Sequence, residues 1–173
     1  MRILIAGAGT IGTNLAAALA TEGQEVVVID AREHALARLQ ATVDCQTVHG
    51  NALSARTLED LGIRRTDLLV AVTQDDATNM AVCRLADFYH VPRKLARVRN
   101  PEFSAADCPI PSEHFGIDHI ISPEGIAADH IHRLVRCPGA REAIDFERGR
   151  IALRALPVSE ESAVCGERVM DLR

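Results

Sequence analysis

Three glycines near the start of the chain form the clearest ligand-binding pattern in the sequence. They stand in the order G-x-G-x-x-G at Gly7, Gly9 and Gly12, with Thr10 and Ile11 between the last two. In such a loop the first glycine permits a tight turn, the second lets the backbone approach a pyrophosphate, and the third lets a helix pack closely against a strand. The N-terminus of that helix offers free N–H groups to phosphate oxygens. We therefore expect a phosphate-binding loop here.

An acid follows this loop at the spacing of a dinucleotide site. Asp30 ends the β-branched run EVVVID, about 20 residues after the glycines. A carboxylate there accepts hydrogen bonds from the ribose hydroxyls of the adenosine half and repels a 2′-phosphate, so the sequence favours NAD(H) over NADP(H). Arg32 keeps the second alternative open, because its guanidinium either pairs with a 2′-phosphate or lies in solvent at the start of a helix.

Other polar residues follow the remaining strands that we expect in the first half. Asn51 and Ala52 follow the third expected strand and Gly50, near the place where an adenine would lie, and Thr73 and Asp75 follow the run DLLVAV. Ligands of open α/β sheets bind beyond the carboxyl ends of the strands, and both loops meet that condition. Asp75 is also well placed to be the N-cap of the next helix, and the two roles can coexist.

Two arginines, Arg97 and Arg99, close the next apolar run. Side chains two residues apart on a strand share a face. Two neighbouring guanidinium groups can bind phosphate or the carboxylates of a partner. The alternative is that both are exposed charges at the edge of the sheet.

The apolar pattern predicts the framework that positions these residues. Strands are expected at 2–6, 25–30, 45–49, 67–73, 95–99 and 117–122, and helices at 11–22, 33–41, 57–61, 75–90 and 123–136. The last helix is expected to bury a stripe of Ile126, Ile131 and Leu134. Alternating strands and helices predict an α/β fold with an open, doubly wound parallel sheet of about six strands.

The composition changes after Gly139, so we expect a nucleotide-binding domain at 1–139 and the start of a small C-terminal lobe at 140–173. Within the second segment, FERGRIAL predicts a hairpin that turns at Arg148 and Gly149.

The composition restricts the classes of function. The chain has 173 residues and a formal net charge of −5, which argues against general nucleic-acid binding. It has neither an apolar run near the ~20 residues that span a bilayer nor a signal peptide. A soluble, cytoplasmic protein is therefore expected. Five widely spaced cysteines argue against a disulfide framework or a zinc site.

Catalytic motifs such as H-E-x-x-H and G-x-S-x-G are absent, and no sizeable substrate domain follows the glycine loop. The sequence thus predicts a binding protein rather than an enzyme. An NAD-dependent oxidoreductase fragment is one alternative. A subunit that has lost its ligand is another, although the three glycines and Asp30 argue against it.

The chain resembles the N-terminal RCK (KTN) domain of the TrkA family. The resemblance rests on MRILIAGAGTIG, VVVID, VHGNA, DLLVAVTQDDATNMAVC, LARVRNPEF and DHIISPE, in this order along 1–124, and on IHRLVRCPGA after them. The T-x-D-[ED]-x-N-M and I-S-P-E runs are more specific than the glycine loop. Members of the TrkA type carry two tandem units, each with a smaller lobe, whereas this chain has one unit and the start of a lobe.

The resemblance implies a regulatory subunit of a potassium-uptake system, peripheral on the inner face of the membrane and bound to a potassium-translocating membrane subunit. It implies homo-oligomers, from dimers toward a ring, whose shape responds to NAD(H), ATP or ADP. By position, the glycine loop with Arg97 and Arg99 would face phosphates, and Asp30 the ribose. Asn51, Ala52 and Thr73 would neighbour the adenine. Glu124 matches an acid near the phosphate site or a subunit interface.

Overall fold

The computed structural model describes residues 1–105, 107–146, 150–168 and 170 of the chain. It divides into two compact units, Met1–Pro123 and Glu124–Arg173. The boundary predicted near Gly139 lies inside the second unit. The turn predicted at Arg148 and Gly149 lies outside the described residues.

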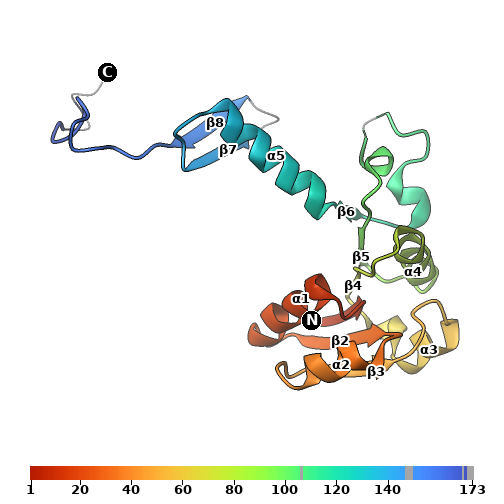
Figure 1. Ribbon diagram of the computed structural model, residues 1–173. Coiled ribbons are helices and arrows are strands. Elements are labelled where there is room, and N and C mark those ends of the chain that lie inside the picture. Colours follow the sequence, from red (N-terminus) through yellow and green to blue (C-terminus); the bar gives the residue numbers. More distant parts are fainter. Residues whose placement is uncertain (106, 147–149, 169, 171–173) are drawn as a thin grey trace. The chain divides into compact units, whose positions relative to one another are not determined.

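The first unit contains a six-stranded parallel sheet (Figure 1). Its strands are β1 (Arg2–Ala6), β2 (Glu25–Asp30), β3 (Gln46–His49), β4 (Leu68–Ala71), β5 (Arg93–Arg97) and β6 (His119–Ile121). They lie in the order β3-β2-β1-β4-β5-β6, and every neighbouring pair is parallel. The order reverses between β1 and β4, and ligands of such sheets bind at this reversal, beyond the carboxyl ends of the strands.

Helices cover both faces of the sheet because successive strand residues point to opposite sides. In β1, Ile3 and Ile5 join a core cluster with α1 (Thr10–Thr21) and α2 (Glu33–Gln40). Leu4 and Ala6 join the other cluster, with α3 (Ala55–Asp60) and α4 (Asp76–Phe88). The predicted doubly wound α/β fold, of Rossmann type, is confirmed.

Short 3₁₀ turns complete the first unit: η1 (Ile63–Arg65), η2 (Pro101–Ser104) and η3 (Ser112–Phe115). The prediction of the fifth strand at 95–99 is wrong by two residues, because Arg93 pairs with Leu68 and the strand already ends at Arg97. Its early residues are charged, so an apolar pattern misses them. The Lys94 ammonium is buried, where it donates to the Val91 carbonyl at 3.0 Å and pairs with Asp87 and Asp118.

The second unit contains the antiparallel hairpin of β7 (Glu142–Phe146) and β8 (Ile151–Ala155), as predicted, and most of α5 (Pro123–Arg136). The expected buried stripe on α5 is wrong, since no residue of this helix is buried, and Ile126 and Ile131 are 64 % and 59 % exposed. A helix and a two-stranded hairpin are too small to cover a full apolar stripe. None of the described helices combines the length and apolar composition needed to span a membrane.

Candidate nucleotide-binding site

The glycine loop connects β1 to α1, and its three glycines meet different surroundings. Gly7 has φ +114°, and its N–H donates to the Ile29 carbonyl at 2.8 Å. A Cβ on Gly12 would lie 1.9 Å from the Gly7 carbonyl oxygen, so only glycine lets α1 start against the loop. At Gly9 the nearest atom to a Cβ would be Arg32 Nη2, at 3.9 Å. Gly7 and Gly12 therefore shape the loop, while Gly9 leaves its backbone open to a ligand.

The first turn of α1 begins at Gly9, which acts as its N-cap. Among the described residues, no side chain donates or accepts a capping hydrogen bond there, and the first turn contains no acid. The N–H groups of this turn thus keep their partial positive charge for an anion.

The carboxylate of Asp30 lies directly beside this loop, at the end of β2. Its Oδ2 accepts a hydrogen bond from the Ala8 N–H at 2.6 Å, and its Oδ1 accepts one from the Arg32 N–H at 2.8 Å. The Arg32 guanidinium adds two more, from Nε to Oδ1 and from Nη2 to Oδ2, each at 3.1 Å. Burial raises the pKa of Asp30, but these hydrogen bonds outweigh burial and hold its pKa below the ordinary value.

A crevice of about 340 Å³ opens at the carboxyl ends of β1, β2, β3 and β4. Two neighbouring hollows, of about 430 Å³ and 200 Å³, continue along the glycine loop, and Gly9 and Thr10 line both. The larger hollow is also lined by Arg32. The smaller one is also lined by Ile11 and Arg97. The predicted site residues that line the crevice itself are Gly7, Asp30, Arg32, Asn51, Ala52, Thr73 and Asp75.

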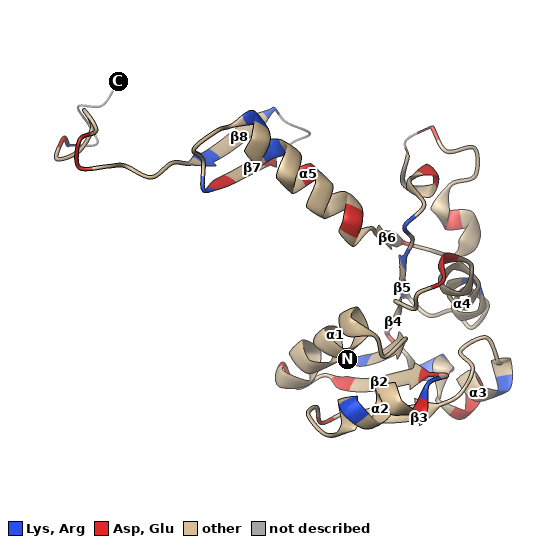
Figure 2. Ribbon diagram, viewed as in Figure 1, with Lys and Arg blue, Asp and Glu red and all other residues tan. Residues whose placement is uncertain are grey.

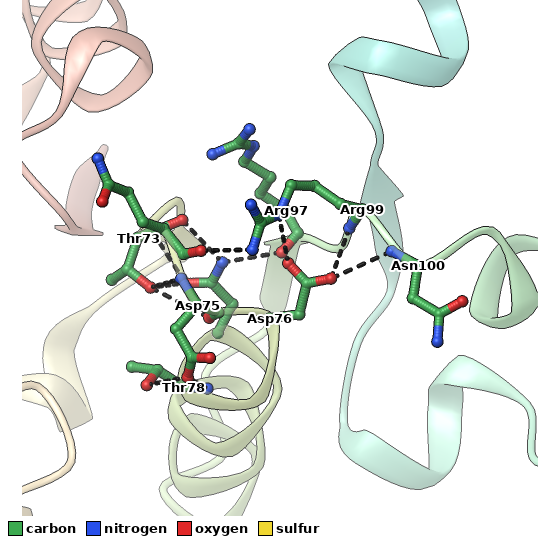
Figure 3. A network of polar contacts seen from close by, with 9 residues as sticks. Thr73, Asp75, Asp76, Thr78, Arg97, Arg99 and Asn100 are labelled. Atoms are coloured by element: carbon green, nitrogen blue, oxygen red, sulfur yellow. Dashed lines mark hydrogen bonds and ion pairs between the residues drawn. The ribbon is translucent and has the colours of Figure 1, made fainter.

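The two predicted arginines have separate surroundings. Arg97 ends β5 and lines the hollow beside the glycine loop. Arg99 follows the strand, and its guanidinium donates to Asp76 Oδ1 at 3.1 Å and to the Gln74 carbonyl at 2.6 Å (Figure 3). Arg99 and Gly12 line none of the three hollows around the loop. Of the two arginines, Arg97 thus lines a hollow beside the glycine loop, whereas Arg99 ties the segment after β5 to the start of α4.

Asp75 performs the capping role that the sequence left open. Its Oδ2 accepts hydrogen bonds from the Thr78 N–H at 2.7 Å and the Thr78 hydroxyl at 2.6 Å, and both lower the pKa of Asp75 (Figure 3). The same residue lines the crevice, so its cap fixes one wall of the site.

Asn79 is a residue that the site prediction missed. It is fully buried in α4. Its side-chain amide accepts a hydrogen bond from the N–H of Thr73, in the loop after β4, and donates one to the carbonyl of Arg97 on β5. Its place in the run TQDDATNM was the available signal, because an asparagine on the buried side of a helix needs polar partners.

Basic and acidic residues are interspersed along the first unit (Figure 2). The charged side chains that line the crevice are those of Asp30, Arg32 and Asp75, and Arg97 lines the smaller hollow along the glycine loop.

A family model described as the TrkA-N domain matches residues 3–123, which include the whole glycine loop and all of the six strands except Arg2. The chain belongs to the TrkA-N domain family. The Trk system potassium uptake protein TrkA of Vibrio alginolyticus is 34 % identical over 100 % of this TrkA-N chain, which spans 38 % of that protein. The TrkA homolog of Methanothermobacter thermautotrophicus is 33 % identical over 99 % of the chain and 77 % of its own length.

Solved structures of GsuK share the TrkA-N fold of this chain. GsuK bound to ADP is 26 % identical, with a TM-score of 0.63, over 78 % of this chain and 33 % of that chain. The GsuK channel bound to NAD has a TM-score of 0.66 at 16 % identity, over 84 % of this chain and 25 % of that chain, a likeness of fold.

Proposed function

We propose that this chain is the nucleotide-sensing domain of a regulatory subunit in a potassium-uptake system. The observation that carries the proposal is that the Asp30 carboxylate lines the crevice while the open Gly9 backbone lines the adjoining hollow, with the Ala8 N–H bonded to Asp30 between them. This pairing provides donors for phosphate and an acceptor for ribose within reach of a single nucleotide.

Each part of an adenine nucleotide has a place in the proposed site. The adenine lies among Asn51, Ala52 and Thr73, which line the same crevice as Asp30. The ribose hydroxyls donate to Asp30, and the phosphates accept from the N–H groups at the start of α1, with Arg97 nearby. The ligands proposed are NAD(H), ATP and ADP, and the ADP-bound and NAD-bound structures of GsuK support this choice.

The proposed partner is a potassium-translocating membrane subunit, because the relatives that cover the whole chain are potassium uptake proteins. The chain would act on the cytoplasmic face of the membrane as part of a homo-oligomer. Regulation requires that the nucleotide bind one arrangement of the assembly more tightly than another. Binding rather than catalysis is proposed, so the nucleotide would leave the site unchanged.

Potassium flux tests this proposal. The whole protein that contains this chain is reconstituted in liposomes with its potassium-translocating subunit, and flux is measured with NADH, NAD⁺, ATP and ADP on the side of the regulatory subunit. At least one nucleotide is expected to change the flux several-fold in the wild type and in Glu33→Ala, an exposed neighbour, but not in Asp30→Ala. Equal flux with and without all four nucleotides, or hydride transfer from NADH during the assay, overturns the proposal.

A further inference from the structure

The carboxylate of Asp30 has no acceptor position left for a ribose. Two carboxylate oxygens offer about four lone-pair positions. Ala8 N–H and Arg32 N–H fill two of them, and the Nε and Nη2 groups of Arg32 fill the other two. The backbone donors are fixed by the glycine loop and the end of β2. The two side-chain donors are the ones that can leave.

A ribose diol matches the two donors that can leave. Its 2′- and 3′-hydroxyls are neighbouring O–H donors, and the Arg32 guanidinium presents neighbouring N–H donors to both oxygens of Asp30. The Asp30 side chain is only 8 % exposed, so little of the carboxylate is open to a diol while Arg32 is bonded to it. Binding of a nucleotide with a free diol thus exchanges the Arg32 side chain for the ribose.

The displaced Arg32 guanidinium can move into open space beside the crevice without disturbing the fold. The Arg32 side chain is 42 % exposed, and it lines both the crevice and the hollow of about 430 Å³ beside Gly9 and Thr10. It therefore stays near the ribose after it leaves Asp30, on the side where a 2′-phosphate would lie.

We propose that Arg32 determines ribose specificity by competing with the nucleotide's 2′,3′-diol for Asp30, which weakens the site's preference for NAD(H) over NADP(H). The proposal rests on the nucleotide-binding function proposed above. A free diol must break the bidentate ion pair, which opposes binding. A 2′-phosphate is instead attracted by the guanidinium, since phosphate is the anion that arginine pairs with best.

The test is isothermal titration of the full chain with NADH and with NADPH, comparing the wild type with Arg32→Ala. Loss of the competing pair is expected to tighten NADH binding about threefold to tenfold and to leave NADPH binding no tighter. Arg84→Ala, which removes an exposed ion pair with Asp87 on α4, is the matched control and should bind NADH like the wild type.

The outcomes separate this inference from the proposed function. The proposed competition is overturned, while nucleotide binding stands, if Arg32→Ala binds NADH no more tightly than the wild type. The same holds if the affinity of Arg32→Ala for NADPH rises as much as its affinity for NADH. If neither protein binds NADH, this inference falls, and the proposed function falls with it only if ATP and ADP do not bind either. Arg32→Lys guards against a folding defect, because it keeps the positive charge but loses the bidentate contact with Asp30. Its NADH binding is expected to tighten less than that of Arg32→Ala, and its NADPH binding to become no tighter.

Discussion

Asn79 and Thr73 hold each other at the end of β4 through their side chains and backbone. The N–H and hydroxyl of Thr73 donate to Asn79 Oδ1 at 2.9 Å and 2.7 Å, and Asn79 Nδ2 donates back to the Thr73 carbonyl at 3.2 Å. The same Nδ2 donates to the Arg97 carbonyl at 2.8 Å. One buried amide therefore fixes the ends of β4 and β5, from which Thr73 and Arg97 reach the crevice and its neighbouring hollow.

Replacing Asn79 by alanine should destabilise the chain and weaken nucleotide binding together. The change removes the hydrogen bonds of Asn79 to part-buried backbone groups of Thr73 and Arg97, which costs about 1–3 kcal/mol of unfolding free energy. Urea denaturation measures this loss. Asn14→Ala, on the exposed face of α1, should stay within about 0.5 kcal/mol of the wild type. Equal stability of the two variants would show that the amide does not hold the strand ends.

The glycines of the loop should separate folding from binding. Gly12→Ala places a Cβ against the Gly7 carbonyl, so we expect it to lower the unfolding free energy by about 1–3 kcal/mol. Gly9→Ala meets only the end of the flexible Arg32 side chain, so its stability should stay near that of the wild type while nucleotide affinity falls. Thermal unfolding and titration with ADP check the pair. A destabilised Gly9→Ala with normal affinity would reverse these assignments.

Asp30 should make stability depend on pH in the acid range. Its native pKa lies below the ordinary value of 3.8, so the unfolded state takes up a proton first as the pH falls. The stabilisation is fully present above about pH 5 and is lost as the pH drops through 3.8 toward the lowered pKa. Urea denaturation from pH 7 down to the lowest pH at which the chain still folds should show a smaller decline in the free energy of unfolding for Asp30→Asn than for the wild type. Identical declines would mean that the carboxylate is not held as described.

Cys83 should be unreactive in the native chain. Burial raises the pKa of its thiol to about 12, with Asp118 adding to the effect and Lys94 opposing it. Because the thiolate is the reactive form, alkylation by iodoacetamide at pH 8 should modify the exposed Cys165 and spare Cys83 until urea unfolds the chain. Mass spectrometry of the peptides reads both sites. Labelling of native Cys83 at the rate of Cys165 is the contrary result.

The sequence predicted the sheet well because its strands are apolar on both faces, and the glycine loop because its glycines have fixed tasks. It missed the start of β5, where Lys94 is buried by pairing with Asp87 and Asp118, contacts that only the tertiary structure makes. It left two interpretations of Arg32 open, a solvent-exposed residue or a partner for a 2′-phosphate. A pattern of residue types cannot show that its guanidinium bonds to Asp30. The wrong prediction of a buried stripe on α5 has a similar cause, because periodicity identifies an apolar face but not whether another element covers it.

Nucleotide binding at Asp30 is the central claim, and isothermal titration of the chain with NADH, NAD⁺, ATP and ADP tests it most directly. We predict that at least one of these ligands binds the wild type and Glu33→Ala equally. Asp30→Ala should bind it at least about tenfold more weakly, as expected for the loss of hydrogen bonds to a charged group. Absence of binding by all four ligands, or equal affinity in Asp30→Ala, would contradict the account.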